Sequence, residues 1–239
     1  MIRVETRQSA EEITDSVNPW GDINSNSWRF RAFRAEWFAT AASYASSTEL
    51  LDQARAALES DDTDRIILKS EALQRAVASG IIALSDGYLE EIGRVYEELS
   101  PYAGTASISL FVPYDRDLGL LAAALGRYDD AAQHFEASME LCRKGVFHPQ
   151  LAWTQADYAE MLLGRDNEGD REKATTIQDE ALAGAREMGM QPLVERILAS
   201  RGILRASSST DLRWASPPRD LIHPGIMSRF LNPPAGRQH

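Results

Sequence analysis

The sequence predicts an all-α protein, a superhelix of stacked helix hairpins with a helical cap at its N-terminus. The helix-forming residues Ala, Leu, Glu, Arg and Gln dominate residues 27–204. Prolines at positions 101, 113, 149 and 192 recur at intervals suited to the connections and first turns of successive hairpins. Small and large apolar residues also recur with a period of about 40 residues, which is typical of repeat architectures.

The helices are expected near residues 9–17, 28–46, 48–59, 64–80, 87–100, 114–125, 129–144, 150–164, 170–188 and 192–204. Two of them begin with a capping-box spacing, at Ser9 and at Ser46. One stretch, Thr105 to Val112, has a strand-like composition and is expected to be an isolated extended connector. Whether it pairs with another segment is left open.

The repetition is clearest at the centre of the chain. Gly119, Gly126, Ala131 and Phe135 have counterparts 39 residues earlier in Gly80, Gly87, Ile92 and Tyr96, and later in Ala159, Ala174 and Ala181. Gly119 and Ala131 are small residues expected where helices approach closely, and Phe135 is expected to fill the core between them. Gly126 is expected to end its helix in a left-handed turn.

The central run Leu118-Gly119, Leu125-Gly126, Tyr128, Ala131 and Phe135 resembles the tetratricopeptide repeat. More widely, residues 96–196 resemble the C-terminal tetratricopeptide-like region of bacterial LuxR-type regulators with an ATPase segment, and of ATPase-linked adenylate cyclases. The resemblance implies an accessory scaffold that acts in transcription regulation. This sequence departs from that family because it lacks a phosphate-binding loop, a cyclase domain and a C-terminal DNA-binding helix-turn-helix.

Composition limits the function further. The 239 residues carry a net charge of −11, which disfavours nucleic acid and anionic lipid as partners. No secretory or membrane-spanning segment is evident, so a cytoplasmic protein is expected, with its lone Cys142 free and buried. None of the four histidines has a second ligand at metal-binding spacing, and His134 is expected on an outward helix face. No enzyme activity, cofactor or metal is therefore expected.

The expected binding surface is the concave face formed by the first helix of each hairpin. In the repeat register this face includes Gln74, Arg116, Trp153 and Glu160. Trp153 is the predicted anchor, because an aromatic residue among charged groups is a common hot-spot composition. The alternative is that Trp153 simply belongs to the core.

Three segments are expected: an N-terminal helical cap over 1–63, helical repeats over 64–204, and a Pro/Arg-rich tail over 205–239. The stretch 201–239 holds 6 Arg, 2 Asp and 5 Pro, which leaves 19 basic and 34 acidic residues in 1–200. The tail either folds back onto this acidic body or has no role. The expected function is a regulatory scaffold that binds a protein or peptide on its concave face. The alternatives are a fragment of a LuxR-type regulator working with an ATPase or DNA-binding partner in trans, and an enzyme with an unrecognised small-molecule site.

Overall fold

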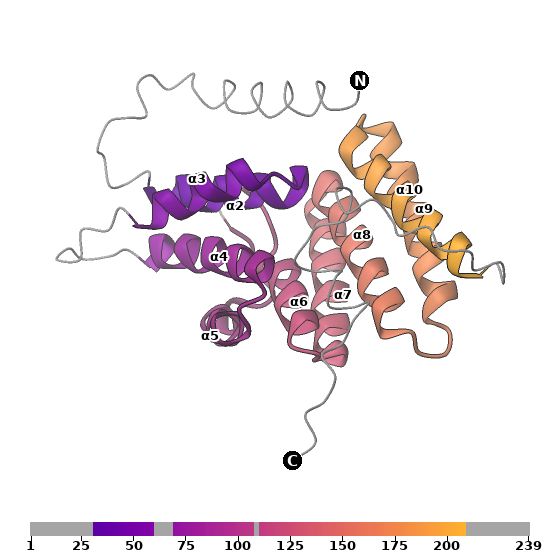
Figure 1. Ribbon diagram of the computed structural model, residues 1–239, viewed down its shortest axis with the longest axis horizontal. Helices are drawn as coiled ribbons and strands as arrows, with labels where there is room; N and C mark the ends of the chain where they lie inside the picture. Colours follow the sequence, from indigo (N-terminus) through magenta and orange to yellow (C-terminus); the bar gives the residue numbers. More distant parts are fainter. Residues whose placement is uncertain (1–30, 60–68, 108–109, 209–239) are drawn as a thin grey trace, which may run out of the picture. The chain divides into compact units, whose positions relative to one another are not determined.

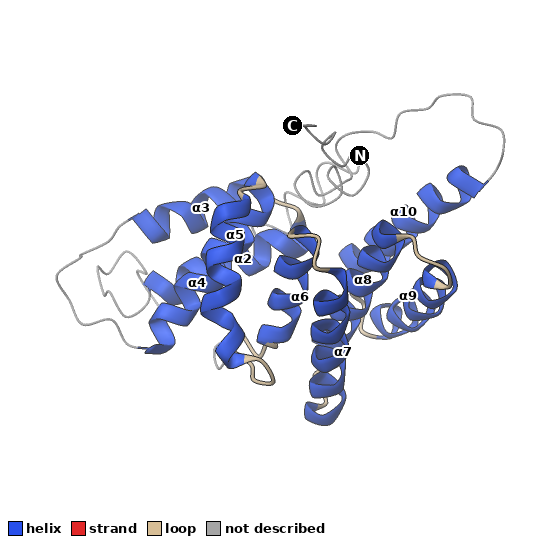
Figure 2. Ribbon diagram, turned by 90° about the horizontal axis from the view of Figure 1, so that it is seen from below, coloured by secondary structure: helices blue, strands red, loops and turns tan. Residues whose placement is uncertain are grey.

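The computed structural model describes residues 31–59, 69–107 and 110–208, and these residues are almost entirely helical (Figure 1). Figure 2 shows helices joined by short loops and no strand in this part of the chain. The helices are α2 (Arg31–Ala45), α3 (Thr48–Glu59), α4 (Lys69–Asp86), α5 (Leu89–Leu99), α6 (Tyr114–Ala124), α7 (Tyr128–Gly145), α8 (His148–Arg165), α9 (Asp170–Glu187) and α10 (Gln191–Ser208), with a 3-10 turn η3 (Ser100–Tyr102) after α5. The predicted all-α helical-repeat fold is confirmed, and the helix expected over 9–17 lies outside the described residues.

The chain divides into two compact units, Met1–Ala78 and Ser79–His239. In the first unit, α2 and α3 form a hairpin whose interface is lined by small residues, among them Ala35, Ala39 and Ala54, all fully buried. The cap boundary expected at 63/64 falls outside the described residues. At the other end of the chain, α10 continues to Ser208, past the expected limit at 204.

The second unit contains two successive hairpins, α6/α7 and α8/α9, followed by α10. Neighbouring helices along the chain pack against one another, so that α7, α8, α9 and α10 lie side by side in Figure 1. The first helices, α6 and α8, are buried over most of their circumference, whereas α7 and α9 alternate buried and exposed positions. This division follows from stacking, because each first helix has neighbours on both sides.

The small residues of the central repeat act as predicted. A Cβ on Gly119 would lie 2.9 Å from the ring of Phe135, so only glycine lets that ring pack against the α6 backbone. Phe135 and Ala131 are fully buried. Gly126 has a φ of 75° and ends α6 in a left-handed turn.

Gly80 differs from the expectation that its helix ends there. α4 continues through Gly80 to Asp86, and the left-handed residue that follows it is Gly87. A Cβ on Gly80 would lie 3.0 Å from Cγ1 of Val95 on α5. Gly80 therefore serves close packing between helices, which overrides its low helix propensity.

The strand-like stretch pairs with its own neighbourhood. An isolated antiparallel bridge joins Ala106 to Pro113, and the backbone N–H of Ser107 donates to the carbonyl of Val112 at 2.9 Å. The connector thus folds back on itself before α6 begins, which satisfies backbone groups that an isolated extended segment would leave unpaired.

The turn between α7 and α8 places a β-branched residue in the left-handed region. Val146 has a φ of 58° and its side chain is 64% exposed. Its backbone N–H and that of Phe147 both donate to the carbonyl of Cys142, which caps the end of α7. Cys142 is free and buried, as predicted.

Candidate interaction surface

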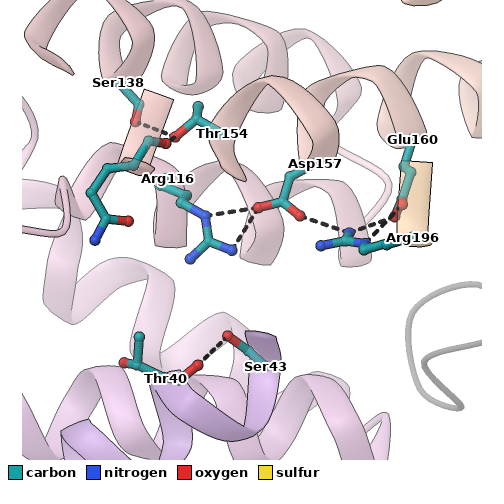
Figure 3. A network of polar contacts seen from close by, with 9 residues as sticks. Thr40, Ser43, Arg116, Ser138, Thr154, Asp157, Glu160 and Arg196 are labelled. Atoms are coloured by element: carbon teal, nitrogen blue, oxygen red, sulfur yellow. Dashed lines mark hydrogen bonds and ion pairs between the residues drawn. The ribbon is translucent and has the colours of Figure 1, made fainter. Parts of the chain in front are cut away.

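Four charged side chains form a continuous chain of ion pairs along the first helices of the second unit (Figure 3). Arg116 on α6 donates from Nε to Oδ2 of Asp157 on α8 at 2.8 Å, and its Nη2 lies 2.7 Å from the same oxygen. Arg196 on α10 donates from Nη2 to Oδ1 of Asp157 at 2.7 Å. Arg196 also binds both carboxylate oxygens of Glu160, at 2.9 and 2.6 Å. We call these four residues the charge ladder.

The charge ladder is buried at its centre. The side chains of Arg116 and Asp157 are each 2% exposed, while that of Arg196 is 27% exposed. Burial by itself would raise the pKa of Asp157, but the guanidinium groups of Arg116 and Arg196 outweigh burial and hold this pKa below its usual range. The ladder contains two positive and two negative groups, so it neutralises itself.

Trp153 lies on the same side of α8 as Asp157 and Glu160, because residues three, four and seven apart share a helix face. The guanidinium carbon of Arg196 lies 5.7 Å from the centre of the indole ring, within cation–π range. Trp153 is 6% exposed.

The structure therefore brings three of the four predicted binding residues onto the ladder face: Arg116, Trp153 and Glu160. Each is engaged with neighbours inside the protein. Gln74, the fourth, is a partly exposed residue of α4 in the first unit, and it too has an interaction partner. Whether any of the four contacts a partner protein stays a prediction.

The opposite face of α8 borders an open cavity of about 510 Å³ in the second unit. At 100° per residue, positions 148, 151, 152 and 155 point roughly away from positions 153, 157 and 160. The end of α7 and the last turns of α9 also line the cavity. Its lining residues are Arg143, His148, Leu151, Ala152, Gln155, Glu180, Gly184, Glu187 and Met188. We call this space the α8–α9 cavity.

The lining of the α8–α9 cavity combines the apolar residues Leu151, Ala152 and Met188, which we call its apolar floor, with exposed charged residues, which we call its rim. Glu180 accepts a hydrogen bond from Nε2 of Gln155 at 2.7 Å and lies 4.0 Å from Nη2 of Arg143. Glu187 is exposed and makes no ion pair with any residue that the structure describes. An apolar hollow beside a carboxylate without a counter-charge suits a ligand that carries an apolar side chain next to a cationic one.

A second polar chain links α5, α6 and α7, and sequence reasoning missed it. His134 contacts Oδ1 of Asp115 through Nδ1 at 2.8 Å and the hydroxyl of Tyr96 through Nε2 at 3.1 Å. His134 thus points toward neighbouring helices, and its expected outward position was wrong. Tyr96 and His134 are 38 residues apart, close to the repeat length, and this spacing was the available signal. Asp115 also accepts a hydrogen bond from the backbone N–H of Gly104, so the chain ties the connector to three helices.

In the described ranges, no group of three or more His, Cys, Asp or Glu side chains has a geometry that could hold a metal ion. Within the same ranges, no helix has the length and apolar character needed to cross a membrane.

Comparison with known protein families supports the repeat assignment. Residues 112–187, which comprise the α6/α7 and α8/α9 hairpins, match the tetratricopeptide repeat model. Searches against curated proteins and against solved structures gave no match. The α6 to α9 region is therefore a tetratricopeptide-like repeat region within an all-α helical-repeat fold.

Proposed function

We propose that the chain is a non-enzymatic scaffold that binds a segment of another protein in the α8–α9 cavity. Tetratricopeptide repeats generally mediate protein–protein interaction, and this supports the class of function. The observation that carries the choice of site is the cavity itself: about 510 Å³, open, apolar at its floor, and edged by Glu187, which pairs with no cation in the described part of the chain. The face of α8 that carries the charge ladder is a weaker candidate for the binding site, because its charged groups already bind one another.

The partner segment should carry a basic residue next to a large apolar one. The apolar side chain would occupy the floor made by Leu151, Ala152 and Met188, and the basic group would lie beside Glu187. Residues 1–200 carry 19 basic and 34 acidic residues, and this negative field would speed the approach of such a segment.

A peptide array provides the test. The full chain should bind peptides containing Arg or Lys next to Phe, Leu or Met, and Glu187→Lys should weaken that binding roughly tenfold, the loss of one favourable charge contact. Glu172→Lys, an equal change of charge at the exposed start of α9, should leave the affinity unchanged. Peptide binding that responds equally to both changes would place the site elsewhere, and failure to bind any peptide would refute the scaffold function.

The concave-face residues remain a second proposed surface, with Trp153 as its anchor. Because Trp153 packs beneath Arg196, a Trp153→Ala change removes internal contacts as well as a candidate binding group. Weaker binding by this variant supports Trp153 as the anchor only if its far-UV CD spectrum and unfolding free energy match those of the unchanged protein. An unaltered pull-down would remove Trp153 from the binding surface.

A regulatory role rests on the resemblance to LuxR-type regulators alone, with the ATPase or DNA-binding activity supplied by a partner in trans. A neighbouring coding frame with the missing phosphate-binding loop would favour it. Thermal-shift measurements with nucleotides and metabolites test the competing idea of an enzyme, since a scaffold should show no shift with ATP or cAMP.

A further inference from the structure

The α8–α9 cavity lies within reach of the chain's own C-terminal residues. α10 starts at Gln191, just after Met188 at the edge of the cavity, and ends at Ser208. At 1.5 Å per residue this helix of 18 residues carries the chain about 27 Å from that edge. The 31 residues that follow, 209–239, lie outside the described part of the chain.

The sequence of that segment carries the chemistry that the cavity favours. Arg229 is followed directly by Phe230 and Leu231, with no acidic residue between them. An Arg-Phe-Leu run offers a guanidinium for Glu187 and an aromatic side chain for the apolar floor.

The distance along the chain from Ser208 decides which aromatic residue of 209–239 can reach the cavity. An extended chain covers about 3.3 Å per residue, so at least eight residues after Ser208 are needed to return about 27 Å. Phe230 follows Ser208 by 22 residues and has ample reach, up to about 70 Å. Trp214, which follows Arg213 and has similar chemistry, comes only six residues after Ser208 and reaches about 20 Å, short of the Met188 edge of the cavity.

From the cavity, the carboxylate of Glu187 at its rim and this reach, we propose that residues Arg229–Leu231 of the same chain bind in the α8–α9 cavity and compete with a partner protein for it. Tethering by a linker of this length gives an effective concentration in the millimolar range, so even a weak contact occupies the cavity most of the time. A partner must displace residues Arg229–Leu231 from the cavity, so these residues lower the apparent affinity of the chain for the partner. The inference rests on the proposed function in using the same cavity.

Photo-cross-linking in the full chain tests this proposal. With the photoreactive analogue p-benzoylphenylalanine in place of Phe230, ultraviolet light should join position 230 to the cavity peptides around Leu151 or Met188, as identified by mass spectrometry. The same analogue in place of Trp214 is the matched control and should give no cross-link to the peptides around Leu151 or Met188. Glu187→Lys should reduce the yield from position 230 several-fold, whereas Glu172→Lys should not change it.

Three results would overturn the proposal: no cavity cross-link from position 230, equal yields in the two charge variants, or cross-links that join two chains in a concentration-dependent way. The last would assign the cavity to the segment of a second copy.

A peptide measurement separates this proposal from the function on which it rests. The double change Arg229→Glu with Phe230→Ser should raise the affinity of the full chain for an external basic-apolar peptide at least several-fold. Peptide binding that depends on Glu187 but is indifferent to the double change would leave the scaffold function standing and refute the role of the C-terminal residues. A cavity cross-link in a protein that binds no external peptide would support the role of the C-terminal residues and refute the scaffold function.

Discussion

The charge ladder makes a strong prediction about stability, because its central carboxylate binds two guanidinium groups away from water. Asp157→Asn keeps the size and shape of this side chain and removes its charge. Arg116 then loses the negative charge of Asp157 at a site where its own side chain is 2% exposed. Arg196 is less affected, since it keeps Glu160 at 2.6 Å and has some access to water.

Breaking a buried ion pair from one side typically costs about 3–5 kcal/mol, because the remaining charge stays buried without compensation. We expect about 3 kcal/mol here, the lower end, since Arg196 keeps a partner. For a unit of about 160 residues this corresponds to a fall in Tm of about 6–12 °C. The exposed pair Arg94–Glu98 gives the matched comparison, and Glu98→Gln should cost less than about 1 kcal/mol.

Urea unfolding followed by far-UV CD measures both variants. A double replacement, Arg116→Met with Asp157→Leu, should recover most of the lost stability, since an apolar pair of similar volume removes the buried positive charge together with its carboxylate. If Asp157→Asn costs no more than Glu98→Gln, the ladder does not stabilise the stack and the reasoning fails.

Four further predictions concern packing, backbone conformation, thiol chemistry and pH. Gly119→Ala should lower the unfolding free energy by about 1–3 kcal/mol, because its Cβ would press on the ring of Phe135; a neutral result in urea unfolding would contradict the close approach. Val146→Gly should raise stability by about 1 kcal/mol by relieving a left-handed β-branched residue, whereas Val146→Ala should bring no such gain in the same assay. Burial raises the pKa of Cys142 to about 11, so a thiol reagent near pH 8 should modify the folded protein at least roughly a hundredfold more slowly than the urea-unfolded chain. The pKa of Asp157 is lowered in the folded state, so its stabilisation is complete above its ordinary pKa of 3.8 and is lost as the pH falls below that value; Asp157→Asn should lose less stability than the unchanged protein on acidification in this range.

The fold was predictable because its signals are local. Small residues such as Gly119 and Ala131 recur at the repeat length, and a glycine such as Gly126 or Gly87, placed directly after a helical pattern, marks the end of that helix. Gly80 shows where local reasoning stops: a glycine that ends a helix and a glycine that admits a neighbouring side chain look alike in the sequence. Only the position of Val95 on α5 distinguishes them.

The candidate site was predictable in part. The repeat register placed Arg116, Trp153 and Glu160 on one face, and the structure gathers them there. The repeat register did not show that Arg116 binds Asp157, 41 residues later, or that Arg196 of α10 binds the same carboxylate. Such pairing depends on the offset between stacked helices. The α8–α9 cavity escaped prediction for a related reason, since its lining comes from the ends of three helices and follows no single periodicity.

The charge ladder and the proposed binding cavity lie on different faces of α8, so stability and binding should vary independently. Asp157 and Glu160 connect α8 to its neighbours on one face, whereas Leu151 and Gln155 line the cavity on the other. Because the ladder pairs its own charges, a partner in the cavity gains nothing from them directly, and a loosened ladder lowers affinity only through the population of folded protein. Well below the melting temperature, therefore, Asp157→Asn should bind peptide as tightly as the unchanged chain, while Glu187→Lys should bind it weakly at unchanged Tm. A ladder variant that remains folded yet loses binding would show that the two faces are coupled through α8.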